Sequence, residues 1–408
     1  MLIDISPLRR HRDYRLLYFG QWVSVLGTFL TYVALPVELY QLTHSSEVVG
    51  LLGLVQLGPL AATALYGGAV ADSLDRRKLL LVCEVILCCG SAGLALCAAL
   101  PHPSPLPFFV IAALMSGVSG FHSPALTSIT QKLVPIEDIP AVSALGSLLG
   151  TSASILGPAI AGIWIAKFGA TATFALDAIS YLASLFALAS IRAMPPPDSA
   201  PRAGLQSVLD GLRYALSRQE LLGTYLVDFL AVGLAMPMSL FPALASQWGG
   251  ADAAGYLYSA MSAGAFAITL FSGWTGKVRR RGMAVTLAAL GWGASLAALG
   301  FAHSLPAALA CLAVAGAFDM VSGLFRTTLW NETIPSELRG RMAGIEQLSF
   351  MSGPLLGNAR AGWMGEKLGL GRAIRTGGFL CMAAVAATIP LLPGFWRYQA
   401  DSPAHKDT

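Results

Sequence analysis

Charge is scarce in this chain. Charged residues make up 12% of the 408 positions, whereas hydrophobic residues make up 55%. A soluble domain carries about 25% charged residues, so this chain has too few of them to cover a water-facing surface of its size. The composition therefore excludes an ordinary soluble protein and indicates a membrane protein.

The motifs of soluble chemistry are missing as well. The sequence has no Gly-x-x-x-x-Gly-Lys-Ser/Thr segment, which argues against an ATP-driven pump. The six cysteines lie within apolar stretches and show neither a disulfide framework nor the spacing of a metal site. No Ser-His-Asp set stands on a recognisable hydrolase scaffold. We therefore expect no enzyme activity, no metal and no cofactor.

Long apolar stretches are abundant. A bilayer core about 30 Å thick needs about 20 apolar residues per helix, and runs such as 79–82 and 307–314 do not alternate as the strands of a membrane barrel would. The sequence therefore predicts an all-α polytopic membrane protein with twelve transmembrane helices. They are expected at 16–40, 48–71, 79–100, 106–130, 141–166, 170–191, 221–246, 253–276, 283–302, 306–331, 342–365 and 373–395.

The basic residues gather at every second boundary between these stretches. Arg76, Arg77 and Lys78 follow the second stretch, and Lys277 to Arg281 follow the eighth. The positive-inside rule then places both termini in the cytoplasm. Nucleic-acid binding is the rival interpretation, but it would gather the charges on one soluble face, so we expect a lipid bilayer and no nucleic acid as partner.

One long polar interruption divides the chain. It predicts an N-terminal six-helix bundle (1–192), a cytoplasmic linker (193–220), a C-terminal six-helix bundle (221–396) and a polar cytoplasmic tail (397–408). Leucine and valine at helical spacing within 205–216 predict a short amphipathic helix on the membrane face. A solvated linker is the alternative.

The two halves also repeat each other. Seven residues of 135–169 recur 200 positions later, namely Pro135, Glu137, Gly157, Ala161, Gly162, Lys167 and Gly169 as Pro335, Glu337, Gly357, Ala361, Gly362, Lys367 and Gly369. Duplicated halves place a symmetry axis through a central cavity, as in many transporters. The repeat therefore favours a transporter.

The loop after the second stretch carries a motif that runs from Gly68 through Asp72 and Asp75 to Arg76 and Arg77. It resembles the loop 2–3 signature of the major facilitator superfamily, Gly-x-x-x-Asp-basic-x-Gly-basic-basic. Ser73 and Asp75 depart from that pattern, and the Asp-Arg-Arg variant is similar to the branch of enterobactin-type exporters. A degenerate copy occupies 273–281 in the second half. Segments 133–148, 211–220 and 335–341 resemble the same branch.

The fifth stretch carries a second motif, of small residues and one proline. Gly146, Gly157, Pro158 and Gly162 resemble the motif that the superfamily associates with exporters and antiporters, although alanine stands at 153 and 161 where glycine is usual. Ordinary packing of small residues is the alternative. The branch often has asparagines and an arginine along this helix, where Ser143, Gly146, Thr151 and Ser154 stand here, so its substrate contacts are not carried over.

The resemblance implies a twelve-helix major facilitator fold in a bacterial-type inner membrane. It implies a monomeric secondary exporter of a small amphipathic molecule, such as a siderophore or a similar secreted metabolite, driven by the proton gradient through alternating access. A broad-specificity drug/proton antiporter is the main alternative. An importer, or a membrane protein without transport activity, is a further one.

Ionisable residues inside membrane spans cost about 2.5–3.5 kcal/mol each, so each is a candidate functional residue. Asp319 lies near the middle of the tenth stretch and could carry a proton, with an interhelical strut as the alternative. Asp228 could line a cavity or form a strut, and Arg360 could bind an anion or neutralise a carboxylate. The other candidates for proton coupling or substrate contact are Glu38, His122, Trp22 and Tyr32. An interfacial position is the alternative for Glu38 and a packing role is the alternative for His122, whereas Asp177 is expected to be structural.

Charged residues near the cytoplasmic ends are candidates for gate ion pairs that break as the halves rock. Mere surface charge is the alternative, above all for Glu332 and Arg341. Besides the loop 2–3 motif, the set comprises Glu84, Arg326, Glu332, Arg341 and Glu346.

Overall fold

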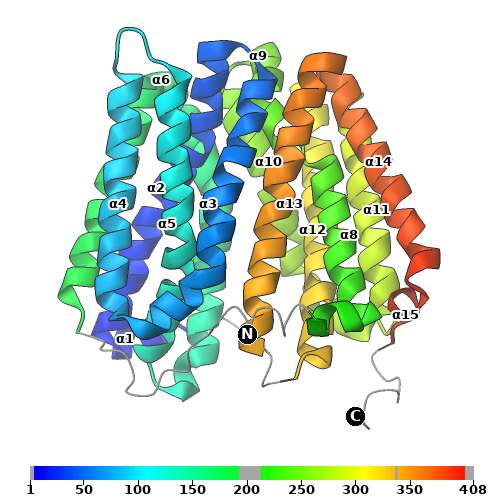
Figure 1. Cartoon of the computed structure of the whole chain (residues 1–408), viewed down its shortest axis with the longest axis horizontal. Coiled ribbons are helices and arrows are strands. Elements are labelled where there is room, and N and C mark those ends of the chain that lie inside the picture. The colour runs from blue at the N-terminus through cyan, green and yellow to red at the C-terminus, as the bar shows by residue number, and fades with distance from the viewer. Residues whose placement is uncertain (1–3, 193–212, 336–338, 400–408) are drawn as a thin grey trace. The chain divides into compact units, whose positions relative to one another are not determined.

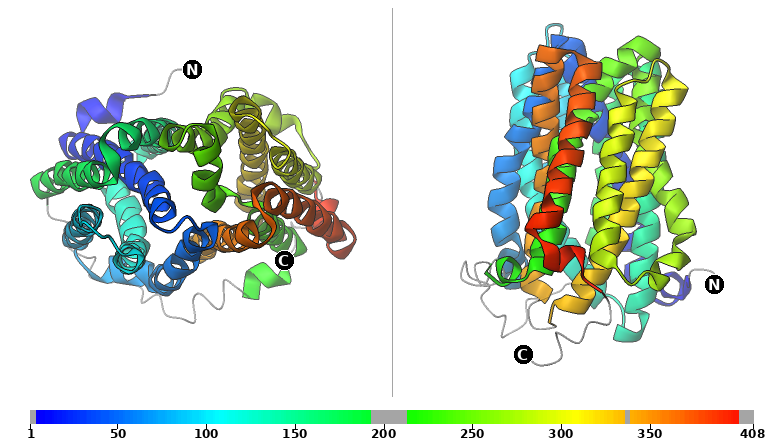
Figure 2. Two further views of the ribbon diagram at one scale, coloured as in Figure 1. Left: turned by 90° about the horizontal axis from the view of Figure 1, so that it is seen from above. Right: turned by 90° about the vertical axis from the view of Figure 1, so that its right-hand side faces the viewer.

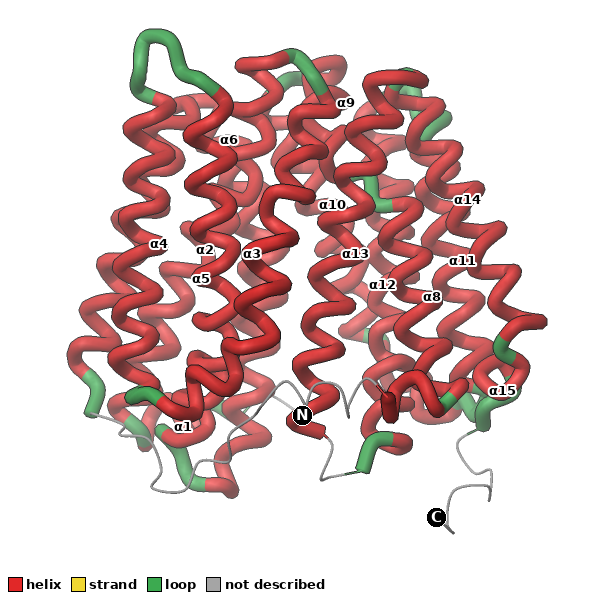
Figure 3. The backbone as a smooth tube through the Cα atoms, viewed as in Figure 1, coloured by secondary structure: helices red, strands yellow, loops and turns green. Residues whose placement is uncertain are grey.

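The computed structural model describes residues 4–192, 213–335 and 339–399, and the side chains of all of these except 64–73, 339–341 and 343–348. The described part is helical and contains no named strand, and Figure 3 shows long helices joined by short loops. The expected amphipathic helix falls mostly on 205–212, outside the described residues, although 213–217 are helical.

The first half of the sequence forms the helices up to residue 190. These are α1 (Ser6–Arg10), α2 (Arg12–Thr43), α3 (Ser46–Ser73), α4 (Arg76–Ala98), α5 (Pro105–Lys132), the 3₁₀ turn η1 (Ile136–Asp138) and α6 (Ile139–Ser190). The second half forms α8 (Gln219–Ala235), η2 (Met238–Leu240), α9 (Phe241–Trp248), α10 (Ala251–Leu270), η3 (Ser272–Lys277), α11 (Arg281–Leu299), α12 (Leu305–Thr333), α13 (Arg339–Leu368), α14 (Leu370–Leu391) and α15 (Pro393–Trp396).

The lengths of these helices suit a bilayer. Ten helical segments of the described chain are long and apolar enough to span one. One of them, α6, contains two expected spans, and the more polar α13 is long enough to be a further one. The prediction of an all-α polytopic membrane fold is confirmed, and the described helices are consistent with twelve spans.

The break inside α6 is at Gly169. This residue has φ 76° and ψ 176°, a backbone conformation that side chains with a Cβ rarely adopt. Gly369, 200 positions later, has nearly the same conformation, φ 83° and ψ 153°, before α14 begins. The same unusual turn therefore separates helices at equivalent positions of both halves, which supports the repeat.

The seventh and eighth expected spans are less regular than the sequence indicates. α8 ends at Ala235, and Met236 adopts an extended ψ of 120°. Pro237 follows, and a proline disfavours the helical conformation of the residue before it. α9 continues the span after η2. The eighth span, expected to reach 276, is shorter as an α-helix. α10 ends at Leu270, and the chain continues as the 3₁₀ turn η3.

The contacts divide the chain into two compact units. Unit 1 comprises 1–44, 54–204 and 245–259, and unit 2 comprises 45–53, 205–244 and 260–408. The unit boundary at 204/205 falls in the expected linker. In addition, each unit contains one short segment from the other half of the sequence. The first of these segments begins α3, and the second includes the beginning of α10.

Each unit is held together by long helices that pack along one another. In unit 1, α6 packs along α2 and α4, and buried residues such as Tyr14, Leu80 and Ile129 form a continuous cluster. In unit 2, α11 packs along α12 and α14, while α8 packs along α13 and α14. The helices of each unit can be followed by colour in Figure 1 and seen nearly end-on in the left view of Figure 2.

The exterior of both units is apolar along the helices. Leu96, Leu114 and Phe186 are 71%, 62% and 72% exposed in unit 1, and Phe379 is 54% exposed in unit 2. Soluble monomers rarely expose large contiguous apolar patches. These side chains therefore fit contact with lipid tails.

Candidate functional site

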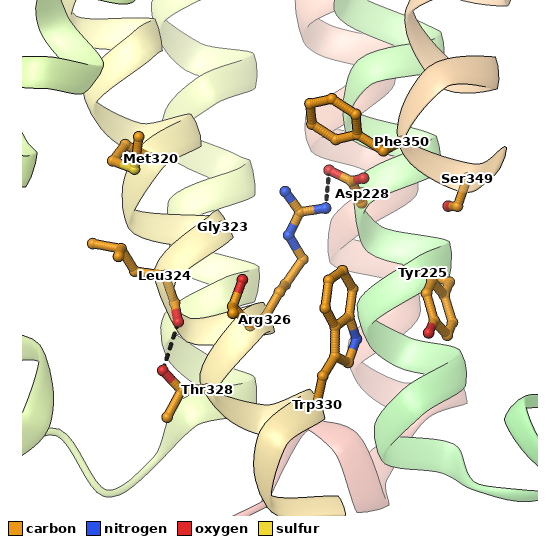
Figure 4. Close-up of a pocket in the computed structure, with 11 residues that line it drawn as sticks. Tyr225, Asp228, Met320, Gly323, Leu324, Arg326, Thr328, Trp330, Ser349 and Phe350 are labelled. Atoms are coloured by element: carbon orange, nitrogen blue, oxygen red, sulfur yellow. Dashed lines mark hydrogen bonds and ion pairs between the residues drawn. The ribbon is translucent and has the colours of Figure 1, made fainter. Parts of the chain in front are cut away.

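A cavity of about 360 Å³ lies in unit 2 among α8, α12 and α13. Its walls combine charged, aromatic and hydroxyl side chains (Figure 4). The charged ones are Asp228 from α8 and Arg326 from α12. Small-molecule sites in proteins usually have volumes of about 300–1,000 Å³, so this cavity is large enough to hold a small ligand.

Asp228 and Arg326 form an ion pair across the cavity wall. A guanidinium nitrogen of Arg326 contacts Oδ1 of Asp228, as the dashed line in Figure 4 marks. The two residues are only 8% and 5% exposed. Removing two charges from water is costly, so each of them needs the other. The sequence interpretation had placed Arg326 near a cytoplasmic gate and Asp228 in a separate group, whereas the structure brings them together.

An aromatic wall stands beside this ion pair. The rings of Tyr225 and Trp330 are stacked with centroids 5.5 Å apart and an interplanar angle of 22°. Trp330 Nε1 donates a hydrogen bond to Thr224 Oγ1 at 2.9 Å, which fixes the indole. Phe350 of α13 also lines the cavity, close to Asp228 in Figure 4, and is 66% exposed. The cavity can therefore receive an apolar or aromatic group next to charged ones.

A second cavity, of about 170 Å³, contains Asp319. It shares Asp228 and Phe350 with the larger cavity, so the two spaces adjoin. Asp319 lies seven residues before Arg326 on α12, about two helical turns, and therefore on the same face. Two carboxyl groups and one guanidinium thus line the adjoining cavities, and Arg326 is engaged by Asp228.

A second interhelical ion pair of unit 2 lies at the ends of two helices. Arg281, at the start of α11, contacts the carboxylate of Glu332 near the end of α12. The Tyr398 hydroxyl lies 3.4 Å from the same carboxylate, and burial, together with Glu332, raises the pKa of Tyr398 to about 12. Sequence reasoning named Glu332 but missed Arg281, although Arg281 ends the second copy of the basic loop motif.

The first copy of that motif caps a helix. Asp75 accepts hydrogen bonds from the backbone N–H groups of Arg77 (3.0 Å) and Lys78 (3.3 Å), so it is the N-cap of α4. Arg77 Nε donates to the Leu188 carbonyl at 2.8 Å, and Arg76 is buried. This capping gives a physical role to Asp75, one of the two residues that depart from the superfamily pattern. Gly68 and the side chains of Asp72, Arg341 and Glu346 are not among the side chains that the structure describes.

Comparison with known proteins decides the family. Residues 3–403 match the model of a family described as transmembrane secretion effectors. The chain belongs to this family of major facilitator superfamily transporters. It is similar to the enterobactin exporter EntS of Shigella boydii and that of Escherichia coli, each 28% identical over 90% of this chain and 88% of the relative.

Solved transporter structures share the fold. One is a mutant of the peptide transporter POT in complex with sulfate, with a TM-score of 0.75 and 13% identity, covering 96% of each chain. Another is a D-xylose-proton symporter, with a TM-score of 0.70 and 15% identity, covering 95% of this chain and 98% of the symporter. The expected major facilitator fold is therefore confirmed.

In this transporter the glycine motif of the fifth span makes close helix contacts. Gly157 packs on Phe29 of α2, and Gly162 packs on the Gly255 backbone of α10, beside the carbonyl of Pro158. Gly146 has no neighbour within 4 Å of where a Cβ would stand. The glycines therefore differ in role, since two of them are contact points and one faces open space.

The second half of the transporter repeats the glycine contact. Gly362 of α13 packs on Gly50 of α3 as Gly162 packs on Gly255. In each case the partner glycine belongs to the short segment that the other half of the sequence contributes to the unit. The repeat seen in the sequence is thus also a repeat of backbone contacts.

Unit 1 of the transporter contains two buried acids. Asp177 is fully buried and accepts hydrogen bonds from Thr31 (2.5 Å) and Ser91 (2.6 Å), as a structural residue would. Glu84, which the sequence interpretation placed among gate candidates, is also fully buried and lies 3.0 Å from His122. Sequence reasoning did not connect these two residues, because no spacing relates positions on different helices.

The remaining candidates are not among the residues that line the two cavities. Glu38 is buried near the end of α2, and Trp22 is half-buried on the same helix. Tyr32 is 45% exposed and makes an edge-on contact with Tyr258 at 5.6 Å. Arg360 donates to the Met364 sulfur at 3.2 Å, so neither of the two predicted alternatives for it is decided.

Proposed function

We propose that this transporter is a proton-coupled exporter of a small amphipathic molecule, such as a siderophore or a similar secreted metabolite. It would lie in a bacterial inner membrane with both termini in the cytoplasm and work as a monomer by alternating access. The observation that carries the proposal is the charged and aromatic cavity of unit 2. The relatives named as enterobactin exporters support the direction and the class of cargo.

The cavity suits an amphipathic cargo because its two sides differ. Tyr225, Trp330 and Phe350 offer flat apolar surface, whereas Arg326 and Asp228 offer a fixed cation and anion. A cargo with an acidic or hydrogen-bonding group can compete with Asp228 for the guanidinium, while its ring or alkyl part rests on the aromatic wall. Binding would thereby loosen one contact between α8 and α12.

Asp319 supplies the proton site of the proposal. With Asp319 ionised, the two carboxylates and one guanidinium of the adjoining cavities carry a net charge of −1. Protonation of Asp319 brings this charge to zero and removes an anionic acceptor, so a proton competes with a cationic or hydrogen-bond-donating group of the cargo for Asp319. Proton entry from outside then favours release of the cargo, and proton loss to the cytoplasm resets the site. The proton gradient is the energy source.

A broad drug/proton antiporter is the second candidate. Met320 and Leu324 also line the larger cavity, and flexible apolar side chains can adapt to several ligands. A panel of dyes and antibiotics separates the two proposals, since a single-substrate exporter protects cells against none of them. Everted vesicles that accumulate the cargo on energisation exclude an importer.

The first test is mass spectrometry of the culture medium of source cells with and without this gene under iron starvation. We expect one iron chelator to disappear from the medium of the deletion strain and to build up inside the cells. An unchanged chelator profile would remove the siderophore from the proposal and leave drug or metabolite efflux.

The coupling role is tested by complementation with Asp319→Asn. This variant should retain binding but lose dependence on the pH gradient. Asp252→Asn is the matched control, because Asp252 is an exposed acid at the start of α10. Full gradient dependence in the Asp319 variant would contradict the assignment.

A further inference from the structure

We propose that Glu84 and His122 form a proton-binding site in unit 1, separate from the Asp319 cavity of unit 2. The role of this site in the transport cycle rests on the proposed proton coupling, whereas proton binding by the pair does not. No sequence motif connects the two residues. Contacts among four helices bring their side chains together.

Those contacts converge on one oxygen. Oε1 of Glu84 accepts hydrogen bonds of 2.8 Å from Gln21 Nε2 and of 2.8 Å from Ser184 Oγ, and it lies 3.0 Å from His122 Nε2. The other oxygen, Oε2, has no hydrogen-bond partner among the described residues. Since Glu84 is 0% exposed, these three groups rather than water stabilise its carboxylate.

Only one of the three can change its charge near neutral pH. Gln21 and Ser184 are neutral donors, and Gln21 Nε2 also lies 2.8 Å from Ser184 Oγ, so these two are held by each other as well. Histidine is the side chain whose ordinary pKa lies closest to neutrality. His122 is therefore the neighbour of Glu84 through which the charge of the cluster can change.

The step takes up one proton and raises the charge of the pair by one unit. In the unprotonated state His122 is neutral with its proton on Nε2, which donates to Glu84, and the pair carries a charge of −1. A proton then binds to Nδ1, Nε2 keeps its own proton and its hydrogen bond, and the pair becomes neutral. The His122 side chain is 15% exposed while that of Glu84 is 0% exposed, so the proton enters and leaves through the histidine.

Other titratable groups lie within electrostatic reach of Glu84. They are Asp177 and Tyr181 on α6, and Cys83 and Cys88 on α4. Asp177 differs from Glu84 because its hydrogen-bond partners are the hydroxyls of Thr31, Ser91 and Ser180 rather than an imidazole. Its surroundings hold a carboxylate in place, whereas those of Glu84 include a group that can take up a proton.

The position of the pair connects proton binding to helix packing. Gln21, Glu84, His122 and Ser184 belong to α2, α4, α5 and α6, respectively. A buried charge that appears and disappears at their meeting point changes the strength of hydrogen bonds on all four helices at once. A change of charge at this pair can thereby bias the packing of unit 1.

Infrared difference spectroscopy of the purified full-length protein tests the proposal directly. Lowering the pH should produce an imidazolium band from His122 that is lost in His122→Gln. Glu84→Gln keeps the shape of the buried side chain but removes the neighbouring negative charge, so the His122 imidazolium band should weaken or disappear over the same pH range. A His122 step that is unchanged by Glu84→Gln, or a spectrum unchanged by His122→Gln, overturns the proposal.

His11 provides the matched control. His11 Nε2 lies 2.7 Å from Asp138 Oδ2 outside the long helices, a histidine–carboxylate pair of the same chemistry. His11→Gln should remove a different histidine step and leave the His122 step in place. Circular dichroism and gel filtration of each variant establish that a lost band is not caused by unfolding.

The spectroscopic test uses no cargo, so its result is independent of the exporter proposal. If the His122 step is absent while Asp319→Asn abolishes gradient dependence, the pair is structural and the proposed function stands. If the His122 step is present while the chelator profile of the deletion strain is unchanged, the proton site stands and the cargo assignment fails.

Discussion

The two units of this transporter treat buried charge differently. In unit 1 the acids Glu84 and Asp177 are enclosed by neutral hydrogen-bond donors and one histidine. In unit 2 the acids Asp228 and Asp319 line adjoining cavities, and a fixed cation, Arg326, holds one of them. An enclosed acid responds to a proton alone, whereas an acid on a cavity wall can also exchange its partner for a ligand. In this duplicated fold one unit thus encloses its acids and the other places its acids beside cavities.

The largest expected effect in this comparison comes from breaking the ion pair of unit 2. Arg326→Leu leaves the Asp228 carboxylate buried without a cation and should destabilise the protein by about 3–5 kcal/mol. Thermal unfolding in detergent and abundance in the membrane measure this loss.

The double variant Arg326→Leu with Asp228→Asn is the control for that effect. It removes both charges and should recover most of the stability. Transport should nevertheless be lost, because the cavity then lacks its cation and its anion. If the double variant is as unstable as the single one, packing of the arginine stem rather than charge pairing is responsible.

The enclosed acid of unit 1 should show a smaller effect. Asp177→Ala leaves the hydroxyls of Thr31 and Ser91 without their acceptor and should cost about 1–3 kcal/mol. Asp177→Asn keeps one oxygen acceptor and should cost less. Equal losses in the two variants would mean that Asp177 contributes through its charge, as the acids of unit 2 do, and the contrast between the units would fail.

The close glycine contacts between helices are a feature that the two units share, and substitutions can test it. A Cβ on Gly162 would stand 2.6 Å from Gly255 Cα, and one on Gly362 would stand 2.8 Å from Gly50 Cα. Gly162→Ala and Gly362→Ala should therefore destabilise the protein by similar amounts, about 1–3 kcal/mol each.

Gly146→Ala is the matched control in the same motif. No atom lies within 4 Å of its new methyl group, and alanine is favoured over glycine in a helix by about 1 kcal/mol, so this variant should be neutral or stabilising. A large loss of stability in Gly162→Ala with none in Gly362→Ala would show that the two halves share the sequence repeat but not the helix contact.

The sequence predicted what depends on local pattern and composition. Apolar stretches located the spans, and the repeat located the paired turns at Gly169 and Gly369. It did not predict which charged residues meet, because Asp228 and Arg326 are 98 positions apart and lie on different helices. The same is true of Glu84 and His122. The cost of a buried charge indicates that a partner is needed, but only the packing of the helices supplies its identity.

The smallest expected effect concerns the starts of two corresponding helices. α4 of unit 1 begins with Asp75, whose carboxylate accepts two backbone N–H groups. α11 of unit 2 begins with Arg280 as N-cap and no side-chain cap, and the neighbouring Arg281 pairs with Glu332 instead. Asp75→Ala should therefore cost about 1 kcal/mol, whereas Asp75→Asn, which still caps, should cost little.

The matched change in unit 2 is Arg280→Ala, which removes no capping bond and should leave the melting temperature nearly unchanged. Glu332→Gln should weaken the start of α11 through Arg281 by an amount comparable to the loss of the cap. If Asp75→Ala has no effect while Glu332→Gln has a large one, only the start of α11 depends on its side-chain contact. The aspartate that departs from the superfamily motif would then be a passive replacement for glycine rather than a cap.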